Sequence, residues 1–224
     1  MEFFYSLVYY KEYKYIINCK IYITGASGFI GFHTSKKLLD KEIKVHRFDS
    51  MNNYYDIDLK KARLNILKKY KNFSFTKGLL ESQKLLDKSV IKFKPEIIIH
   101  LAAQAGVRYS LDNPDIYLNS NIVGTFNLIK IANKIKIKHL IIGSSSSVYG
   151  ANKKIPFKEI DKTDHQVSFY AATKKSTESL AHSYSSLWKL PITMLRFFTV
   201  YGPLGRPDMA YFKFTKKNLR RKKN

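Results

Sequence analysis

Short apolar runs alternate along the chain with longer segments in which apolar residues recur every three or four positions. The runs are rich in β-branched residues, and the central run Ile97–Ile99 is apolar on both faces, as buried strands of a parallel sheet are. This order predicts an α/β fold with a doubly wound parallel sheet, whose strands are joined by crossover helices. The strands that we expect are Lys20–Thr24, Lys44–Phe48, Phe73–Lys77, Glu96–Leu101, His139–Ser144 and Ile192–Phe197, and the helices are Phe29–Asp40, Leu59–Tyr70, Ser82–Phe93, Asn119–Asn133 and Tyr170–Leu187.

Length and composition fit a single folded unit. A chain of 224 residues is long enough for one large α/β domain, or for one domain and a fragment of another. No run of 18 apolar residues occurs, so we expect no transmembrane helix and no membrane partner. The apolar run Phe3–Tyr10 lacks a basic lead-in and a small-residue cleavage site, so we expect no signal peptide. The single cysteine, Cys19, excludes an internal disulfide and fits a reducing compartment, which predicts a cytoplasmic protein.

The formal net charge of +23 raises the question of nucleic-acid binding. Lysine supplies 33 of the 40 basic residues, and the lysines are spread along a chain that is also rich in Ile, Asn, Phe and Tyr. That distribution indicates a compositional bias and a lysine-rich solvated surface, so we expect no nucleic-acid partner. Residues Tyr211–Asn224 hold seven basic residues in 14 positions and no acid, which predicts a solvated helix end or a frayed tail.

A glycine-rich turn follows the first expected strand directly. Gly25, Gly28 and Gly31 are spaced G-x-x-G-x-x-G across the start of the next helix. Glycine permits unusual backbone dihedrals there and lets the backbone approach a pyrophosphate, which the helix N-terminus then binds. Any tight strand-to-helix turn can use glycine, but the surrounding pattern favours a dinucleotide site of the Rossmann type.

An acidic residue ends the second expected strand, 24 positions beyond Gly25. The carboxylate of Asp49 would accept hydrogen bonds from the adenosine ribose and would repel a 2′-phosphate. The alternative is an ordinary aspartate at a strand end. We therefore expect NAD in preference to NADP, although Arg47 lies close by in the sequence.

Tyr170 and Lys174 are spaced by one helical turn and lie on the same face of an expected helix. A lysine ammonium beside the phenol would lower the tyrosine pKa from its ordinary value near 10. Such a tyrosine could take a proton from a sugar hydroxyl while hydride leaves the same carbon. The spacing therefore predicts acid–base chemistry.

The same spacing occurs at Tyr10/Lys14 and at Tyr149/Lys153, so the spacing by itself proves little. Only Tyr170/Lys174 lies on an expected helix with a serine-rich strand end 25 residues upstream. The carboxyl ends of parallel strands are where such sheets bind ligands. Ser145, at that strand end, would share the substrate proton with Tyr170.

His100 ends the fourth expected strand and is predicted to be a structural hydrogen-bonding residue, not a base or a metal ligand. Cys19 precedes the first strand and is predicted to be inert. The sequence contains no cluster of His, Cys, Asp or Glu with metal-ligand spacing, so we expect no metal.

Seven motifs together resemble those of a known family. They are TGASGFIG (Thr24–Gly31), DSMNNYYDIDLKKARL (Asp49–Leu64), HLAAQAGVRYSLDNP (His100–Pro114), NSNIVGT (Asn119–Thr125), SSSSVYG (Ser144–Gly150), SFYAATKK (Ser168–Lys175) and RFFTVYGPLGRPDMA (Arg196–Ala210). From about Cys19 to Thr215, the chain resembles the extended short-chain dehydrogenase/reductases of the NAD-dependent epimerase/dehydratase family. Among these it is most similar to the nucleotide-sugar epimerases that act on UDP-glucuronate.

The resemblance implies an NAD-binding Rossmann fold and a reaction. UDP-glucuronate and UDP-galacturonate would be interconverted through a 4-keto intermediate. Tyr170 would remove the O4 proton while NAD takes hydride from C4, and hydride would return to the opposite face. NAD would end unchanged, so no external redox partner is needed. A homodimer is among the assemblies that the resemblance allows.

Roles follow from the resemblance by position. Ser145, Tyr170 and Lys174 would be catalytic. The residues expected at the NAD site are Gly25, Gly28, Phe29, Ile30, Gly31, Asp49, Ala102, Ala103, Gln104, Asn119, Tyr170 and Lys174. The residues expected to bind the anionic substrate are Arg108, Ser145, Ser146, Ser147, Thr199 and Arg206, and the two arginines suit its diphosphate and carboxylate.

Three departures from the family pattern stand out. The family has a C-terminal substrate-binding portion that this chain largely lacks, so we expect residues 211–224 to be a basic tail at the start of a truncated portion. The family usually has Gly-Asp after the third strand, with the aspartate at the adenine, but here Gly78 precedes Leu79. Residues 1–18 form an N-terminal extension without a family counterpart, which leaves residues 19–210 as the NAD-binding domain.

Two other functions fit the sequence. The first is that of a related nucleotide-sugar enzyme, a 4,6-dehydratase or a uronate decarboxylase. A dehydratase needs an acid and a base beside the catalytic serine, and Ser146 and Ser147 supply neither. The second is that of a non-catalytic, truncated NAD-binding remnant. The intact Ser-Tyr-Lys set favours catalysis, whereas the missing portion favours the remnant.

Overall fold

Six parallel strands form a single sheet at the centre of the molecule. The computed structural model describes residues 19–221, so the predictions for residues 1–18, including the pair Tyr10/Lys14, lie outside the described residues. The sheet has the order β3-β2-β1-β4-β5-β6, so the chain crosses between halves after β3. The strands are β1 (Lys20–Thr24), β2 (Lys44–Asp49), β3 (Phe73–Lys77), β4 (Ile97–His100), β5 (His139–Ser145) and β6 (Ile192–Phe197). This topology confirms the predicted doubly wound sheet.

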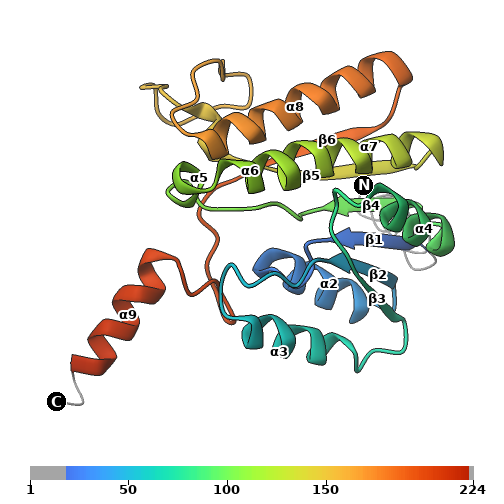
Figure 1. The fold of residues 1–224 in the computed structure, drawn as a ribbon, viewed down its shortest axis with the longest axis horizontal. Coiled ribbons are helices and arrows are strands. Elements are labelled where there is room, and N and C mark those ends of the chain that lie inside the picture. Colours follow the sequence, from blue (N-terminus) through green and yellow to red (C-terminus); the bar gives the residue numbers. More distant parts are fainter. Residues whose placement is uncertain (1–18, 222–224) are drawn as a thin grey trace, which may run out of the picture.

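Helices cover both faces of the sheet, and each face has its own apolar core. Strand β1 shows why: Tyr22 faces one core, whereas Ile21 and Ile23 face the other. The first core lies under α4 (Gln83–Phe93), α7 (Gly124–Lys134) and α8 (Phe169–Trp188), and the second under α2 (Phe29–Leu39) and α3 (Ile57–Leu67). Figure 1 shows α7 and α8 side by side along β5 and β6.

The predicted helix Asn119–Asn133 is present, but its first third is a π-helical segment, η1 (Leu118–Val123), that leads into α7. Two short helices that the sequence did not predict, α5 (Tyr109–Asp112) and α6 (Pro114–Tyr117), come directly before it. Pro114 begins α6, because proline needs no hydrogen-bond partner for its nitrogen at a helix start. The wider π-helical turn changes which side chains face inward, and sequence periodicity does not reveal it.

Helix α3 begins two residues earlier than expected. The carboxylate of Asp56 accepts hydrogen bonds from the backbone N–H groups of Asp58 (2.8 Å) and Leu59 (3.4 Å), which caps the helix. The segment after β6 ends in helix α9 (Ala210–Arg221), which projects away from the sheet (Figure 1) and exposes Phe214 and Leu219. Of the helices in residues 19–221, none combines the length and the apolar character needed to cross a membrane.

Candidate active site

The glycine-rich turn joins β1 to α2 in a space that no side chain could share. Gly25 has φ +71°, and a Cβ there would lie 2.4 Å from the backbone nitrogen of Ala102. Gly28 precedes the first turn of α2, and no side chain caps that turn. The N–H groups at the start of α2 are therefore available to an anion, and the backbone is bare enough for a pyrophosphate to approach. These features fit the expected dinucleotide.

Asp49, at the end of β2, lies directly beside this turn. It is buried, and its two carboxylate oxygens accept hydrogen bonds from the backbone N–H groups of Ser27 (2.8 Å) and Met51 (2.8 Å). Each oxygen keeps a second lone pair, so the carboxylate can still accept hydrogen bonds from a ribose. Its role at the ribose stays a prediction.

Arg47, on the same face of β2, is fully buried. Its Nη2 donates to the hydroxyl of Ser27 (2.9 Å), and its guanidinium lies over the rings of Phe73 and Phe75. Its Nε and Nη1 have no hydrogen-bond partner. Burial lowers the pKa of Arg47 to about 10. The guanidinium is thus enclosed in the protein and is not presented at the surface to a 2′-phosphate.

The segment after β4 forms the next wall of the site. The backbone nitrogen of Ala102 donates to Thr24 Oγ1 (3.2 Å), and Gln104 is buried. The side chain of Asn121 accepts from the backbone nitrogen of Gln104 (2.7 Å) and donates to its carbonyl oxygen (3.1 Å). Asn119, for which we predicted this supporting role, is exposed on η1. Asn121, two residues later, has this supporting position instead of Asn119, because the π-helical turn directs Asn121 inward.

Helix α8 positions the expected catalytic pair. The hydroxyl of Ser168 accepts a hydrogen bond from the backbone nitrogen of Ala171 (3.1 Å), which fixes the helix start immediately before Tyr170. Lys174, one turn further, is buried and donates from Nζ to the carbonyl oxygen of Gly143 (2.7 Å) on β5. Tyr170 is hydrogen-bonded to Ser145, at the end of that strand. The structure thus brings together the three residues that the sequence singles out.

The pKa values of this set differ from our expectation. Burial raises the pKa of Tyr170, although the hydrogen bond with Ser145 and the charge of Arg206 oppose the rise. The prediction that Lys174 lowers the pKa of Tyr170 is therefore wrong for the chain by itself, since the ammonium group of Lys174 is directed to a backbone carbonyl. Burial lowers the pKa of Lys174 to about 8, and attraction to Glu178 limits that fall.

Of the other predicted substrate residues, some lie beside the catalytic set and others are exposed. Ser147 contacts Ser145 directly: its backbone nitrogen donates to Ser145 Oγ (3.1 Å), and the two hydroxyls are also 3.1 Å apart. Ser146 is partly buried in the short helix η2 (Ser146–Tyr149). Arg206 forms a two-pronged ion pair with Asp208 (3.0 and 2.5 Å) close enough to Tyr170 to affect its pKa. The side chains of Arg108 and Thr199 are exposed.

His100 and the second Tyr–Lys pair are structural. The ring of His100 bonds to the hydroxyls of Thr24 (2.6 Å) and Thr125 (2.9 Å), which confirms its predicted role. Tyr149 is buried against Phe157, and its partner in spacing, Lys153, lies in an exposed loop outside any helix. Within residues 19–221, no group of three or more His, Cys, Asp or Glu is placed to hold a metal ion.

A family model described as the NAD dependent epimerase/dehydratase family matches residues 21–223. The chain belongs to this family.

Relatives within the family are similar over most of the chain. A probable UDP-glucuronate 4-epimerase of Rhizobium meliloti (strain 1021) is 54% identical over 192 residues, which are 86% of this chain and 56% of the relative. Protein CapI of Staphylococcus aureus is 54% identical over 197 residues, or 88% of this chain and 59% of the relative. The chain therefore spans less than two thirds of the length of these relatives.

A solved epimerase structure shows the same fold. The UDP-glucuronic acid 4-epimerase from Bacillus cereus, crystallised with UDP-glucuronic acid and NAD, is 35% identical and matches with a TM-score of 0.84. The match covers 90% of this chain and 63% of that chain. The family assignment from sequence motifs is thereby confirmed, and so is the Rossmann-like fold.

Sequence reasoning missed Arg63, which is fully buried on α3. Its guanidinium donates to the carbonyl oxygens of Ser27 (2.8 Å) in the glycine-rich turn and Leu204 (2.6 Å) in the segment before Arg206. It also donates to the hydroxyl of Tyr55 (2.7 Å). An arginine on an amphipathic helix is normally predicted to be exposed to solvent. The one sequence signal for burial is that Arg63 lies on the inward face of α3.

Proposed function

We propose that this chain contains the NAD-binding and catalytic portion of a nucleotide-sugar 4-epimerase that interconverts UDP-glucuronate and UDP-galacturonate. The observation that supports this most is the meeting of Ser145, Tyr170 and Lys174 at the carboxyl end of β5. Together with burial, the charge of Lys174 contributes to the lowered pKa of His100, and His100 is hydrogen-bonded to Thr24 at the start of the glycine-rich turn. These contacts support a single site that contains both the catalytic set and the expected dinucleotide turn.

In this function, NAD bound at the glycine-rich turn would supply the reversible hydride acceptance that inversion at C4 requires. Tyr170 would hold and return the proton of the sugar O4 hydroxyl, because its phenol is paired with Ser145 at the strand end. Ser145 would share that proton and orient the hydroxyl. Lys174 would provide a positive charge behind the tyrosine, and its lowered pKa lets it exchange a proton near neutral pH.

We also propose a role for the anion-binding residues. Arg206 stands near Tyr170 and would attract the negatively charged nucleotide sugar, exchanging its partner Asp208 for the ligand. Residues 19–210 would form the NAD-binding unit, and α9 would belong to the substrate-binding portion. A relative named a probable UDP-glucuronate 4-epimerase (54% identity) and the solved UDP-glucuronic acid 4-epimerase from Bacillus cereus (35% identity) support this choice of substrate.

The test uses the chain as it is and a chimaera extended by the C-terminal portion of Staphylococcus aureus CapI. Each is incubated with NAD and UDP-glucuronate, and the products are separated by chromatography and weighed by mass spectrometry. We expect UDP-galacturonate, at unchanged mass, from the chimaera and little or none from the chain alone. Loss of water or of carbon dioxide would instead indicate a dehydratase or a decarboxylase. If neither protein converts UDP-glucuronate although both bind NAD, the proposed function is wrong.

A further inference from the structure

The end of β5 and one face of α8 meet residue by residue. Three consecutive strand residues contact helix residues that are spaced four apart, and such residues lie on one helix face. The pairs are Gly143 with Lys174 (2.7 Å), Ser144 with Glu178 (2.6 Å), and Ser145 with Tyr170. The proposed catalytic set accounts for the first and third pairs. The middle pair has no role in that set, although it lies between the other two along the strand.

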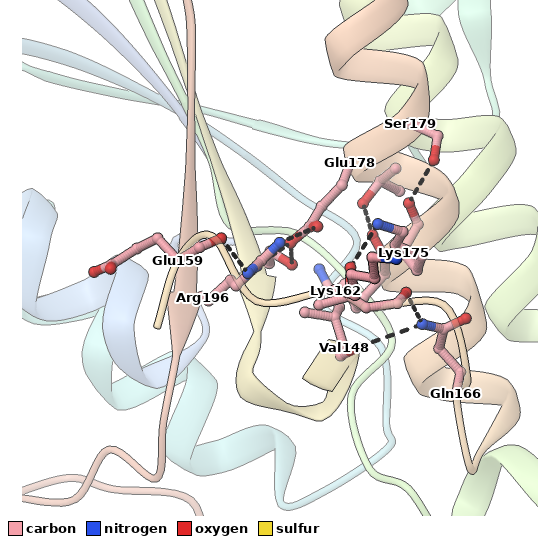
Figure 2. A network of polar contacts seen from close by, with 12 residues as sticks. Val148, Glu159, Lys162, Gln166, Lys175, Glu178, Ser179 and Arg196 are labelled. Atoms are coloured by element: carbon pink, nitrogen blue, oxygen red, sulfur yellow. Dashed lines mark hydrogen bonds and ion pairs between the residues drawn. The ribbon is translucent and has the colours of Figure 1, made fainter. Parts of the chain in front are cut away.

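Glu178 is also held from the neighbouring strand. Arg196 on β6 donates to its carboxylate with two prongs, from Nε (3.0 Å) and from Nη2 (2.9 Å), as Figure 2 shows. Ser144 and Arg196 are directly opposite each other in the register of β5 and β6. The side chains of Glu178 and Arg196 are only 10% and 19% exposed. The carboxylate therefore sits at a fixed place where both strands meet α8.

Arg196 has further contacts that keep it in place. Its Nη1 donates to the carbonyl oxygen of Glu159 (3.1 Å), and its guanidinium lies 4.9 Å from the ring centre of Tyr149. Figure 2 shows the guanidinium between Glu159 and Glu178. A two-pronged, partly buried arginine–carboxylate pair with these supports has a defined geometry and resists screening by salt.

Lys174 interacts with titratable groups on α8 and on β4. Glu178 lies one turn along α8 and attracts the ammonium group, whereas burial disfavours it. The charge of Lys174 also acts on His100, at the end of β4, which is neutral because burial lowers its pKa to about 3. Burial would raise the pKa of Glu178, but the hydrogen bonds from Arg196 and Ser144 hold it below the usual value. Glu178 is thus an ionised carboxylate beside a buried ammonium group.

We propose that Glu178 is a positioning residue of the catalytic set, a role that rests on the proposed function. Its carboxylate keeps Lys174 in the ammonium form, and its hydrogen bond from Ser144 fixes the strand end that holds Ser145. Arg196 determines how strongly Lys174 is affected, because it shares the same carboxylate. Removal of Glu178 and removal of Arg196 should then act on Lys174 in opposite directions.

The experiment measures the Lys174 pKa in the full chain by NMR. Lysine labelled with ¹³C at Cε is incorporated, the Lys174 signal is identified by its absence in Lys174→Arg, and the signal is titrated from pH 6 to pH 10. Glu178→Gln should lower the pKa of Lys174 by about half a unit to one unit. Arg196→Gln should raise it by a similar amount, because Glu178 loses the cation that offsets its charge.

Glu96→Gln is the matched control, since it removes a carboxylate that pairs with Lys138 (2.6 Å) just before β4, away from the catalytic set. It should leave the Lys174 titration unchanged. If Glu178→Gln does not fold, Glu178→Asp, which withdraws the carboxylate by one methylene, should give a smaller shift in the same direction. Shifts of the same sign in the Glu178 and Arg196 variants, or no shift in either, would overturn the proposal and leave the pair a purely structural brace.

The titration requires neither cofactor nor substrate. Opposite shifts in a protein that does not epimerise UDP-glucuronate would support the link between Glu178 and Lys174 while the proposed function fails. Normal epimerase activity with an unmoved Lys174 would do the reverse. The two proposals can therefore fail separately.

Discussion

Arg63 donates a 2.6 Å hydrogen bond to the carbonyl oxygen of Leu204, 141 residues further along the chain. A second donor of the same guanidinium bonds to Ser27 in the glycine-rich turn. The cofactor turn and the segment before Arg206 are therefore tied together through one buried side chain.

Arg63→Met should lower the free energy of unfolding by roughly 1–3 kcal/mol, because the buried carbonyl oxygen of Ser27 and the part-buried one of Leu204 lose their donor. The measurement is urea denaturation followed by circular dichroism. Lys61→Met is the control, because Lys61 is an exposed residue of the same helix whose pair with Asp58 is solvated, and its loss should change stability by less than about 0.5 kcal/mol. Equal effects of the two substitutions would contradict the bracing role of Arg63.

Arg47 presents the opposite case, a buried cation whose Nε and Nη1 have no partner. Arg47→Met keeps much of the volume and removes the desolvated charge, so we expect it to raise the free energy of unfolding by roughly 1–3 kcal/mol. Lys44→Met, at an exposed position on the same strand, should have little effect. A clear loss of stability in Arg47→Met would mean that its single bond to Ser27 and its ring contacts outweigh the burial of charge.

NAD should bind more tightly than NADP, because the Asp49 carboxylate faces the expected ribose site and would repel a 2′-phosphate. Calorimetric titration with both cofactors measures the preference. Asp49→Asn keeps the shape of the side chain and removes the charge, so the preference should narrow. An unchanged preference in this variant, or equal affinities in the unaltered chain, would argue against the assignment of Asp49.

Much of this site could be predicted from the sequence, because local patterns determine it. Strand ends, the glycine turn and the Tyr170/Lys174 spacing are periodic or contiguous features, and the sheet brings them to one edge. The register of η1 could not be predicted, since a π-helical turn has no distinct sequence periodicity. The sequence therefore favours Asn119, whereas the structure buries Asn121. Contacts between distant segments, such as Arg63 with Leu204, depend on tertiary packing and have no local signature.

The sign of the Tyr170 pKa shift could not be predicted either. Sequence spacing places an ammonium group near a phenol, but it does not give the burial of the phenol or the direction of the ammonium. Here burial is the larger effect, and Lys174 bonds to Gly143. The balance between desolvation and charge is a property of the folded site.

Tyr170→Phe should lower epimerase turnover by at least roughly two to three orders of magnitude, the usual scale for loss of a general acid–base group. The assay is the chimaera described above with UDP-glucuronate, and NAD binding serves as the check on folding. Tyr10→Phe, at the same spacing from Lys14, should leave turnover unchanged. A near-normal rate in Tyr170→Phe would refute the acid–base role of this residue.

As the pH falls, the fold should begin to lose stability at pH values well above those at which carboxylates titrate. Burial lowers the pKa of His46 to about 4 and that of His100 to about 3, whereas an unfolded histidine titrates near 6.5. Above pH 6.5 both rings are neutral in both states, so they add no pH dependence. Below pH 6.5 only the unfolded state takes up their protons, so stability falls with falling pH until the folded pKa values are reached. Each histidine should cost up to about 1.4 kcal/mol per pH unit in that window.

Urea denaturation at intervals between pH 7.5 and pH 5 measures this slope. The window lies above the ordinary range of Asp and Glu, so the slope should come mainly from histidine. His46→Gln should remove about half of it, because burial lowers the pKa of this ring, which bonds to Ser74 (2.8 Å) and Thr76 (3.1 Å). His100→Gln should remove a similar share. A flat profile in the unaltered chain, or a slope that survives both substitutions, would show that neither ring is held neutral by burial.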